Sequence, residues 1–183
     1  MKTVSIVAAL VFSGAALTAA SAARVTSAEQ NVVAKVPVSA WIVWGKNQSN
    51  ARVPDMSVEG KKAVRITIPN AGGQPGDATV QSPIKAAIRQ GDRLRMSVWL
   101  KTNASAPGAP GRAILKLKQA KPPYGNLAEQ TVDVGPDWKQ YVLDHVAAQD
   151  IPAGSTNVTV QLGLGQQTVD VGPASVAVVA SGN

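Results

Sequence analysis

The sequence has 183 residues, 45% of them hydrophobic and 16% charged, with 16 Gly and 12 Pro, which suits one globular domain and argues against long disorder. The formal net charge is +7, but the basic residues are spread along the chain, so nucleic acid is not expected as a partner. The chain has no cysteine and a single histidine, His145. This composition excludes disulfides, thiolate zinc sites, cysteine nucleophiles and histidine-rich metal centres.

Residues 1–22 have the pattern of a signal peptide. Lys2 precedes an apolar stretch that is short for a membrane span, and small residues follow it up to Ala22. We therefore expect cleavage after Ala22 and export to the periplasm or the extracellular space. The remaining chain, residues 23–183, keeps 17 basic and 11 acidic side chains, a net charge of about +6 by subtraction of Lys2. No later segment is long and apolar enough to predict a membrane span.

The chain from Val32 onward alternates between apolar and polar residues with a period of two, which predicts half-buried strands. The clearest case is residues 93–101, where Leu94, Met96, Val98 and Leu100 form the inward set. In chain order, strands are expected within residues 63–68, 79–88, 93–101, 113–117, 128–134, 138–146 and 157–164, with a last pair within 168–179. Glycine and proline turns separate them, and no segment of the mature chain has a sustained helical period.

Eight or more short strands joined by such turns predict an all-β fold, a two-sheet antiparallel jelly-roll β-sandwich. The sequence contains no internal repeat, so residues 23–183 are expected to form one domain. Segments 70–77 and 102–111, which are rich in glycine, proline and small residues, are expected to be loops at the ends of the sandwich.

Several of these segments together resemble carbohydrate-binding modules of the family 4 and 9 type, which have a galactose-binding-like jelly roll. The resemblance covers roughly residues 40–180 and consists of hydrophobic spacing and short motifs at residues 62–68, 91–101, 137–141, 160–163 and 167–171. It implies a galactose-binding-like β-sandwich that binds a polysaccharide or oligosaccharide without catalysis. It also implies a separate glycoside hydrolase as a candidate partner.

The sequence departs from this family at two places. Many such modules carry a paired aspartate in the last strand that helps to hold a structural calcium, whereas this chain has Asp170 followed by Val171, Gly172 and Pro173. We therefore expect no cofactor, and a structural calcium is left open but disfavoured. The opening motif of the family is also missing, with residues 41–45 in its place, so the first strand is expected to pair differently.

Sugar recognition needs flat aromatic faces and fixed hydrogen-bonding groups. Tyr124, which follows a stiff proline pair, is the strongest platform candidate, with a turn-packing role as the alternative. Trp99 lies opposite the inward set of its strand and is expected to face away from the core, unless the N-terminal segment covers it. Trp44 is a second platform candidate, or else forms a hydrophobic plug with Trp41. Trp138 is expected to be a core anchor.

The polar candidates come from the same alternation. Lys116 and Lys118 oppose the inward set of one strand and Gln161 opposes that of another, and these two strands are expected to share a sheet near Tyr124. Such a surface offers hydrogen-bond donors and positive charge to a hydroxyl-rich or acidic glycan. The alternative is a solvated strand face whose lysines discourage edge aggregation.

Catalysis is not expected, because glycoside hydrolysis needs two carboxylates across a cleft and most acidic residues here lie in turns. His145 is beside Asp144, and adjacent strand residues point to opposite faces, so they form no ready dyad. The sequence therefore predicts an exported noncatalytic carbohydrate-binding module. The alternatives are a small secreted glycoside hydrolase or its accessory subunit, and a structural or adhesion β-sandwich without a glycan site.

Overall fold

The computed structural model describes residues 30–70, 73–105, 110–122 and 124–180, so the predicted signal peptide lies outside the described residues. Eleven strands are found in this part of the chain: β1 (Gln30–Val36), β2 (Ile42–Trp44), β3 (Ser49–Pro54), β4 (Lys62–Ile68), β5 (Thr79–Ile84), β6 (Arg93–Ser105), β7 (Gly111–Gln119), β8 (Asn126–Val134), β9 (Lys139–Val146), β10 (Thr156–Gln161) and β11 (Gln167–Val179). Three short 3-10 turns join them: η1 (Val38–Ala40), η2 (Glu59–Lys61) and η3 (Pro75–Asp77). No helix in the described part is long and apolar enough to cross a membrane.

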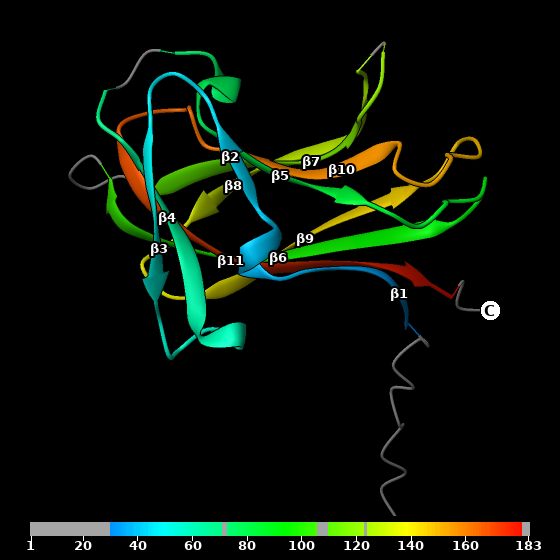
Figure 1. Cartoon of the computed structure of the whole chain (residues 1–183), viewed down its shortest axis with the longest axis horizontal. Helices are drawn as coiled ribbons and strands as arrows, with labels where there is room; N and C mark the ends of the chain where they lie inside the picture. Colours follow the sequence, from blue (N-terminus) through cyan, green and yellow to red (C-terminus); the bar gives the residue numbers. More distant parts are fainter. Residues whose placement is uncertain (1–29, 71–72, 106–109, 123, 181–183) are drawn as a thin grey trace, which may run out of the picture.

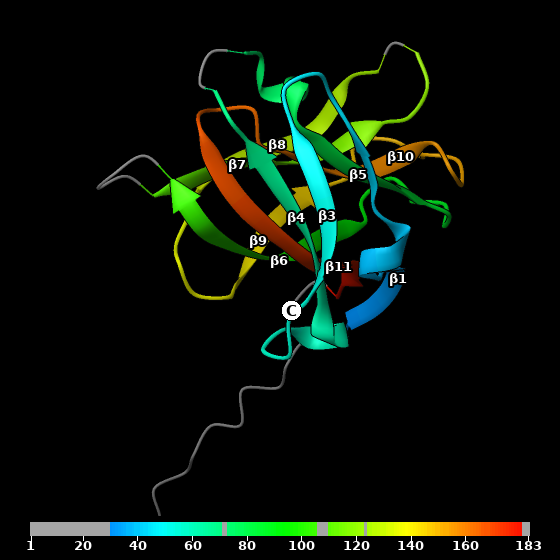
Figure 2. The same ribbon diagram turned by 60° about the vertical axis from the view of Figure 1, so that its left-hand side comes forward.

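The strands form two antiparallel sheets that pack face to face (Figure 1). Sheet A has the order β3-β4-β11-β6-β9, with β1 pairing part of β11, and sheet B has the order β2-β5-β10-β7-β8. Figure 2 shows β3, β4 and β11 side by side, with β1 beside the C-terminal half of β11. This architecture confirms the predicted two-sheet jelly-roll β-sandwich.

The core lies between the sheets and contains the predicted inward sets. On β6, the side chains of Leu94, Met96, Val98 and Leu100 are buried, as the period of two predicts. The facing strands of sheet B contribute their own alternate residues, which are Val80 and Ile84 from β5, Ala113, Leu115 and Leu117 from β7, and Val158 and Val160 from β10. Burial of these side chains leaves the opposite set of each strand on an outer face of the sandwich.

The C-terminal segment differs from its prediction. It is one continuous strand, β11, rather than a pair, because a bulge between Val171 and Ala174 accommodates Gly172 and Pro173 inside the ladder with β6. The first half of β11 pairs with β4 and the second half with β1. Gly172 and Pro173 are typical turn residues and predicted a break between two strands. The bulge accommodates both residues without ending the strand.

Two tryptophans also differ from their predictions. Trp41, expected in an edge plug, is a core residue that is 2% exposed, and its indole nitrogen donates to the Gly172 carbonyl over 2.8 Å. Trp138, expected as a core anchor, is only half-buried and lies outside the core cluster. Its indole nitrogen donates to Asp55, which places the ring on the outer face of sheet A.

Candidate functional site

The outward side chains of sheet B form three rows, which we call the sheet B face. Directly paired residues of antiparallel strands point to the same side, so the register fixes the neighbours. One row contains Trp44, Thr79, Gln161, Ile114 and Thr131; the next contains Ile42, Gln81, Thr159, Lys116 and Glu129; the third contains Pro83, Asn157, Lys118 and Asn126. Polar side chains therefore fill most of the face, and its apolar side chains are Trp44 and Ile42 at the β2 edge, Pro83 on β5 and Ile114 on β7.

Lys116 and Lys118 share the sheet B face with Gln161, as the sequence predicted for these two strands. The Lys116 ammonium lies 3.1 Å from the Glu129 carboxylate, with the lysine side chain 13% and the glutamate side chain 53% exposed. Glu129 also accepts a hydrogen bond from Asn126. Lys116 is therefore a positioned donor whose charge is partly neutralised, whereas Lys118 forms no ion pair among the described residues.

Gln161 and Thr159 bring further hydrogen-bonding groups to the sheet B face. The Gln161 side chain is nearly buried and makes no hydrogen bond within the described part of the chain. The Thr159 hydroxyl is buried and has no partner there either. Buried polar groups are normally hydrogen-bonded, so these two residues are unusual and leave donors and acceptors unmet on this face.

Two exposed aromatic rings flank the same sheet. Trp44 is 44% exposed on the edge strand β2 and lies in the row of Thr79 and Gln161. Tyr124 is 55% exposed in the loop between β7 and β8, where its amide donates to the Lys121 carbonyl over 2.9 Å. Its φ of 58° is uncommon for a bulky residue. The two rings thus come from opposite sides of sheet B, one at the β2 edge and one in the β7–β8 connection.

Trp99 does not lie with the other predicted site residues. It belongs to β6 in sheet A, where it is paired with Gln140 and faces outward, as its alternation predicted. The hydrophobic core separates it from the sheet B face. Trp99 therefore cannot act in one site with Tyr124, Lys116 and Gln161.

Some residues of the sheet B face were missed by the sequence interpretation. Gln81 follows the period of two on a predicted strand and could have been found from it. Ile42 lies on a three-residue strand, which is too short for a periodic pattern. Glu129 lies within the strand predicted over residues 128–134, but the sequence did not indicate that it pairs with Lys116 across the β7–β8 ladder.

The outer face of sheet A holds a connected set of charges. Asp170 is fully buried, and both of its oxygens accept hydrogen bonds from Arg65, at 2.8 and 2.9 Å. The Lys101 ammonium lies 2.5 Å from Asp55 and 3.9 Å from Asp170. Asp170, which here is not followed by the second aspartate of the calcium motif, is thus held by cations, and the described residues contain no group of three or more metal-ligating side chains.

Asp55 gives this network a predicted pH dependence. Hydrogen bonds from Lys101, Ser57 and Trp138 hold the pKa of the Asp55 carboxyl well below its usual range. Since the pKa is lowered in the folded state, the stabilisation is present above the ordinary carboxyl pKa of about 4 and is lost as the pH falls below it. We expect the Asp55→Asn variant to show a shallower loss of melting temperature between neutral pH and about pH 2 than the unaltered chain.

Asp133→Asn is the matched control for this titration. Asp133 is exposed and its ion pair with Arg112 is 3.8 Å long, so its replacement should leave the shape of the acid limb unchanged. An identical acid limb for Asp55→Asn and the unaltered chain would show that Asp55 does not contribute.

Comparison with solved structures identifies the fold. The chain matches a CBM4 structure with a TM-score of 0.56 at 18% identity, over 75% of this chain and 86% of the other. It matches the CBM22-1 xylan-binding domain from Paenibacillus barcinonensis (TM-score 0.57, 10% identity, 84% and 97% coverage). It also matches the N-terminal cellulose-binding domain of a Cellulomonas fimi β-1,4-glucanase with a TM-score of 0.53 at 15% identity, over 77% of this chain and 90% of the other. No family model and no curated protein matches the sequence. The chain therefore has the fold of carbohydrate-binding modules.

Proposed function

We propose that the chain is an exported, noncatalytic carbohydrate-binding module that binds a polysaccharide or oligosaccharide on the sheet B face. The observation that carries the proposal is the row in which the exposed indole of Trp44 and the unpaired amide of Gln161 lie on either side of Thr79. An aromatic face covers the apolar side of a sugar ring while amides and hydroxyls select its hydroxyl groups. Domains named as xylan-binding and cellulose-binding share the fold, which supports this class of ligand.

In this proposal the domain spans residues 23–183, follows a cleaved signal peptide and works in the periplasm or outside the cell beside a separate glycoside hydrolase. A hydrolase function for the chain itself is less well supported. Glycoside hydrolysis needs one carboxylic acid and one free carboxylate across a cleft. Asp55, Asp144 and Asp170 are instead held in ion pairs with Lys101, Arg95 and Arg65. A structural or adhesion role without a glycan site would leave the unmet polar groups of the sheet B face unexplained.

Truncation of the aromatic rings tests the sheet B face directly. We expect Tyr124→Ala and Trp44→Ala each to weaken binding of the best oligosaccharide about tenfold, since a buried aromatic contact contributes on the order of one to a few kcal/mol. Both rings are exposed, so the melting temperature should hardly change. Isothermal titration with xylohexaose and cellohexaose, alongside melting curves, measures both quantities.

Val146→Ala is a suitable control, because Val146 is an exposed apolar residue on β9 of sheet A. Unchanged affinity in both aromatic variants would move the site away from the sheet B face. A tenfold loss in only one of them would assign the platform to that ring alone.

Charge is expected to tune the ligand preference. With a mature charge of about +6 and with Lys118 unpaired among the described residues, glycans that carry uronate groups should bind more tightly than their neutral counterparts. Exposed charge contacts are individually weak and are screened by salt, so the preference should be a few-fold and should shrink between about 0.05 and 0.5 M salt. Comparison of glucuronoxylan with unsubstituted xylan at both salt concentrations checks this, and a salt-independent ratio would contradict it.

A further inference from the structure

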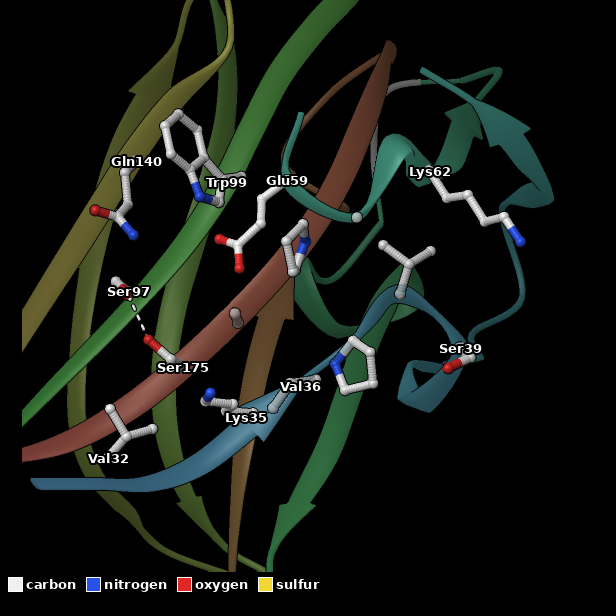
Figure 3. Close-up of a pocket in the computed structure, with 15 residues that line it drawn as sticks. Val32, Lys35, Val36, Ser39, Glu59, Lys62, Ser97, Trp99, Gln140 and Ser175 are labelled. Atoms are coloured by element: carbon white, nitrogen blue, oxygen red, sulfur yellow. Dashed lines mark hydrogen bonds between the residues drawn. The ribbon is translucent and has the colours of Figure 1, made fainter. Parts of the chain in front are cut away.

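A pocket of about 600 Å³ opens on the outer face of sheet A, on the opposite side of the core from the sheet B face. Its walls come from β6 and β9, from the bulge of β11, from β1 and from the η2 turn (Figure 3). The size falls within the range of small-molecule sites. Residues 37–39, around the η1 turn, and η2 also line the pocket, but the other walls are held by strands that are paired on at least one side, so the pocket is largely preformed.

The pocket combines an apolar wall with several hydrogen-bonding groups. Trp99, Val36 and Pro173 contribute apolar surface. The Ser97 and Ser175 hydroxyls form a pair at 2.9 Å. The side chains of Glu59, Gln140 and Lys35 also line the pocket and make no hydrogen bond or ion pair within the described part of the chain. Hydrogen-bond donors and hydrogen-bond acceptors thus surround one apolar surface.

The indole nitrogen of Trp99 is a second, independent indication of a ligand. It is buried without a hydrogen-bond partner, whereas Trp41 donates to Gly172 and Trp138 donates to Asp55. An unsatisfied buried donor is costly, by about 1–3 kcal/mol. Figure 3 shows this nitrogen on the side of the ring that faces Ser97 and Glu59. Glu59 and Gln140, which line the same pocket, are exposed side chains.

We propose that this pocket is a second carbohydrate site, which takes a single pyranose unit or the end of a glycan chain. Alcohol groups suit it because each hydroxyl both donates and accepts, which matches an indole N–H, a carboxylate, an amide and paired serines together. The apolar wall suits the C–H face of a sugar ring. The choice of ligand class rests on the proposed function, but the site uses none of the sheet B residues. One molecule would then bind two glycan chains from opposite sides.

The four indole N–H groups allow both sites to be followed in one experiment. In a two-dimensional ¹H–¹⁵N spectrum of the full chain, Trp44→Phe and Trp99→Phe assign the signals of the two sites. Xylohexaose, cellohexaose, glucose and galactose are then titrated separately into the millimolar range. We expect the Trp99 signal to move with at least one of these sugars, at a different midpoint from the Trp44 signal. The Trp41 and Trp138 signals should stay in place, because their donors are already bonded.

A pair of glutamine variants makes the test specific. Gln140→Ala should shift the midpoint of the Trp99 response at least fivefold and leave the Trp44 response unchanged, while Gln166→Ala, an exposed glutamine outside the pocket, should change neither. A stationary Trp99 signal while Trp44 moves would overturn the second site and leave the proposed function standing. Movement of Trp99 alone would support the pocket and remove Trp44 from the sheet B site. Identical midpoints that both shift in Gln140→Ala would reduce the two sites to one and overturn the inference. Two stationary signals would overturn the second site and remove Trp44 from the sheet B site.

Discussion

Replacing Arg65 with methionine is expected to lower the free energy of unfolding by about 3 kcal/mol, because it leaves a buried carboxylate without its main partner. Arg65 meets Asp170 through two hydrogen bonds of 2.8 and 2.9 Å, and the Asp170 side chain is fully buried. Lys101, 3.9 Å from Asp170, is already engaged by Asp55 and compensates only in part. Urea denaturation of the variant measures the loss from the shift in midpoint.

Arg95→Met is the matched control for this prediction. Arg95 binds Asp144 with the same two distances, 2.8 and 2.9 Å, but both side chains are exposed, at 42% and 58%. Solvent screens such a pair, so its loss should cost less than about 1 kcal/mol. Equal losses for Arg65→Met and Arg95→Met would show that the burial of Asp170 does not set the effect.

A second variant separates the buried charge from the lost contacts of arginine. Asp170→Asn combined with Arg65→Met removes the carboxylate that the single variant leaves unpaired, so the double variant should be more stable than Arg65→Met alone. A double variant that is less stable than the single one would assign the effect to the packing of the Arg65 side chain instead.

The ion pair of Arg65 with Asp170 also shows why part of the fold could be predicted from the sequence and part could not. The alternation of β6 predicted its buried set and the outward position of Trp99, because a period of two is a local property of a strand. The partnership of Arg65 with Asp170 joins residues 105 positions apart and has no local signature. Strands β1 and β3 have mostly exposed residues, so hydrophobic alternation could not indicate them.

The candidate site was predictable to a similar degree. The positions of Lys116, Lys118 and Gln161 on one face required only the alternation and the pairing of β7 with β10. The separation of Trp99 from Tyr124 depended on which sheet each strand joins, which the sequence of a single strand does not specify. The partner of Lys116 was missed because it lies across the β7–β8 ladder on a strand whose outward face is almost entirely polar.

Gly45→Ala is expected to reduce stability by about 3 kcal/mol and to weaken binding at the sheet B face, because the backbone passes too close to a neighbouring loop. Gly45 has a φ of 128°, and a Cβ atom there would lie 2.0 Å from the Asp77 carbonyl oxygen. To relieve this clash, the η3 segment and the end of β2 would have to move apart. Trp44 directly precedes this glycine, so the same movement would displace its ring from the row of Thr79 and Gln161.

Gly91→Ala separates the steric contact from the backbone conformation. Gly91 also has a positive φ, 85°, but a Cβ atom there would meet nothing within 4 Å. Its replacement should cost only about 1 kcal/mol, from the left-handed conformation alone, and should leave binding at the sheet B face intact. Urea denaturation and oligosaccharide titration of both variants decide the matter. Equal stability losses in the two variants would show that the clash with Asp77 is relieved at no cost. An unchanged oligosaccharide affinity in a destabilised Gly45→Ala chain would show that Trp44 is not part of the binding surface.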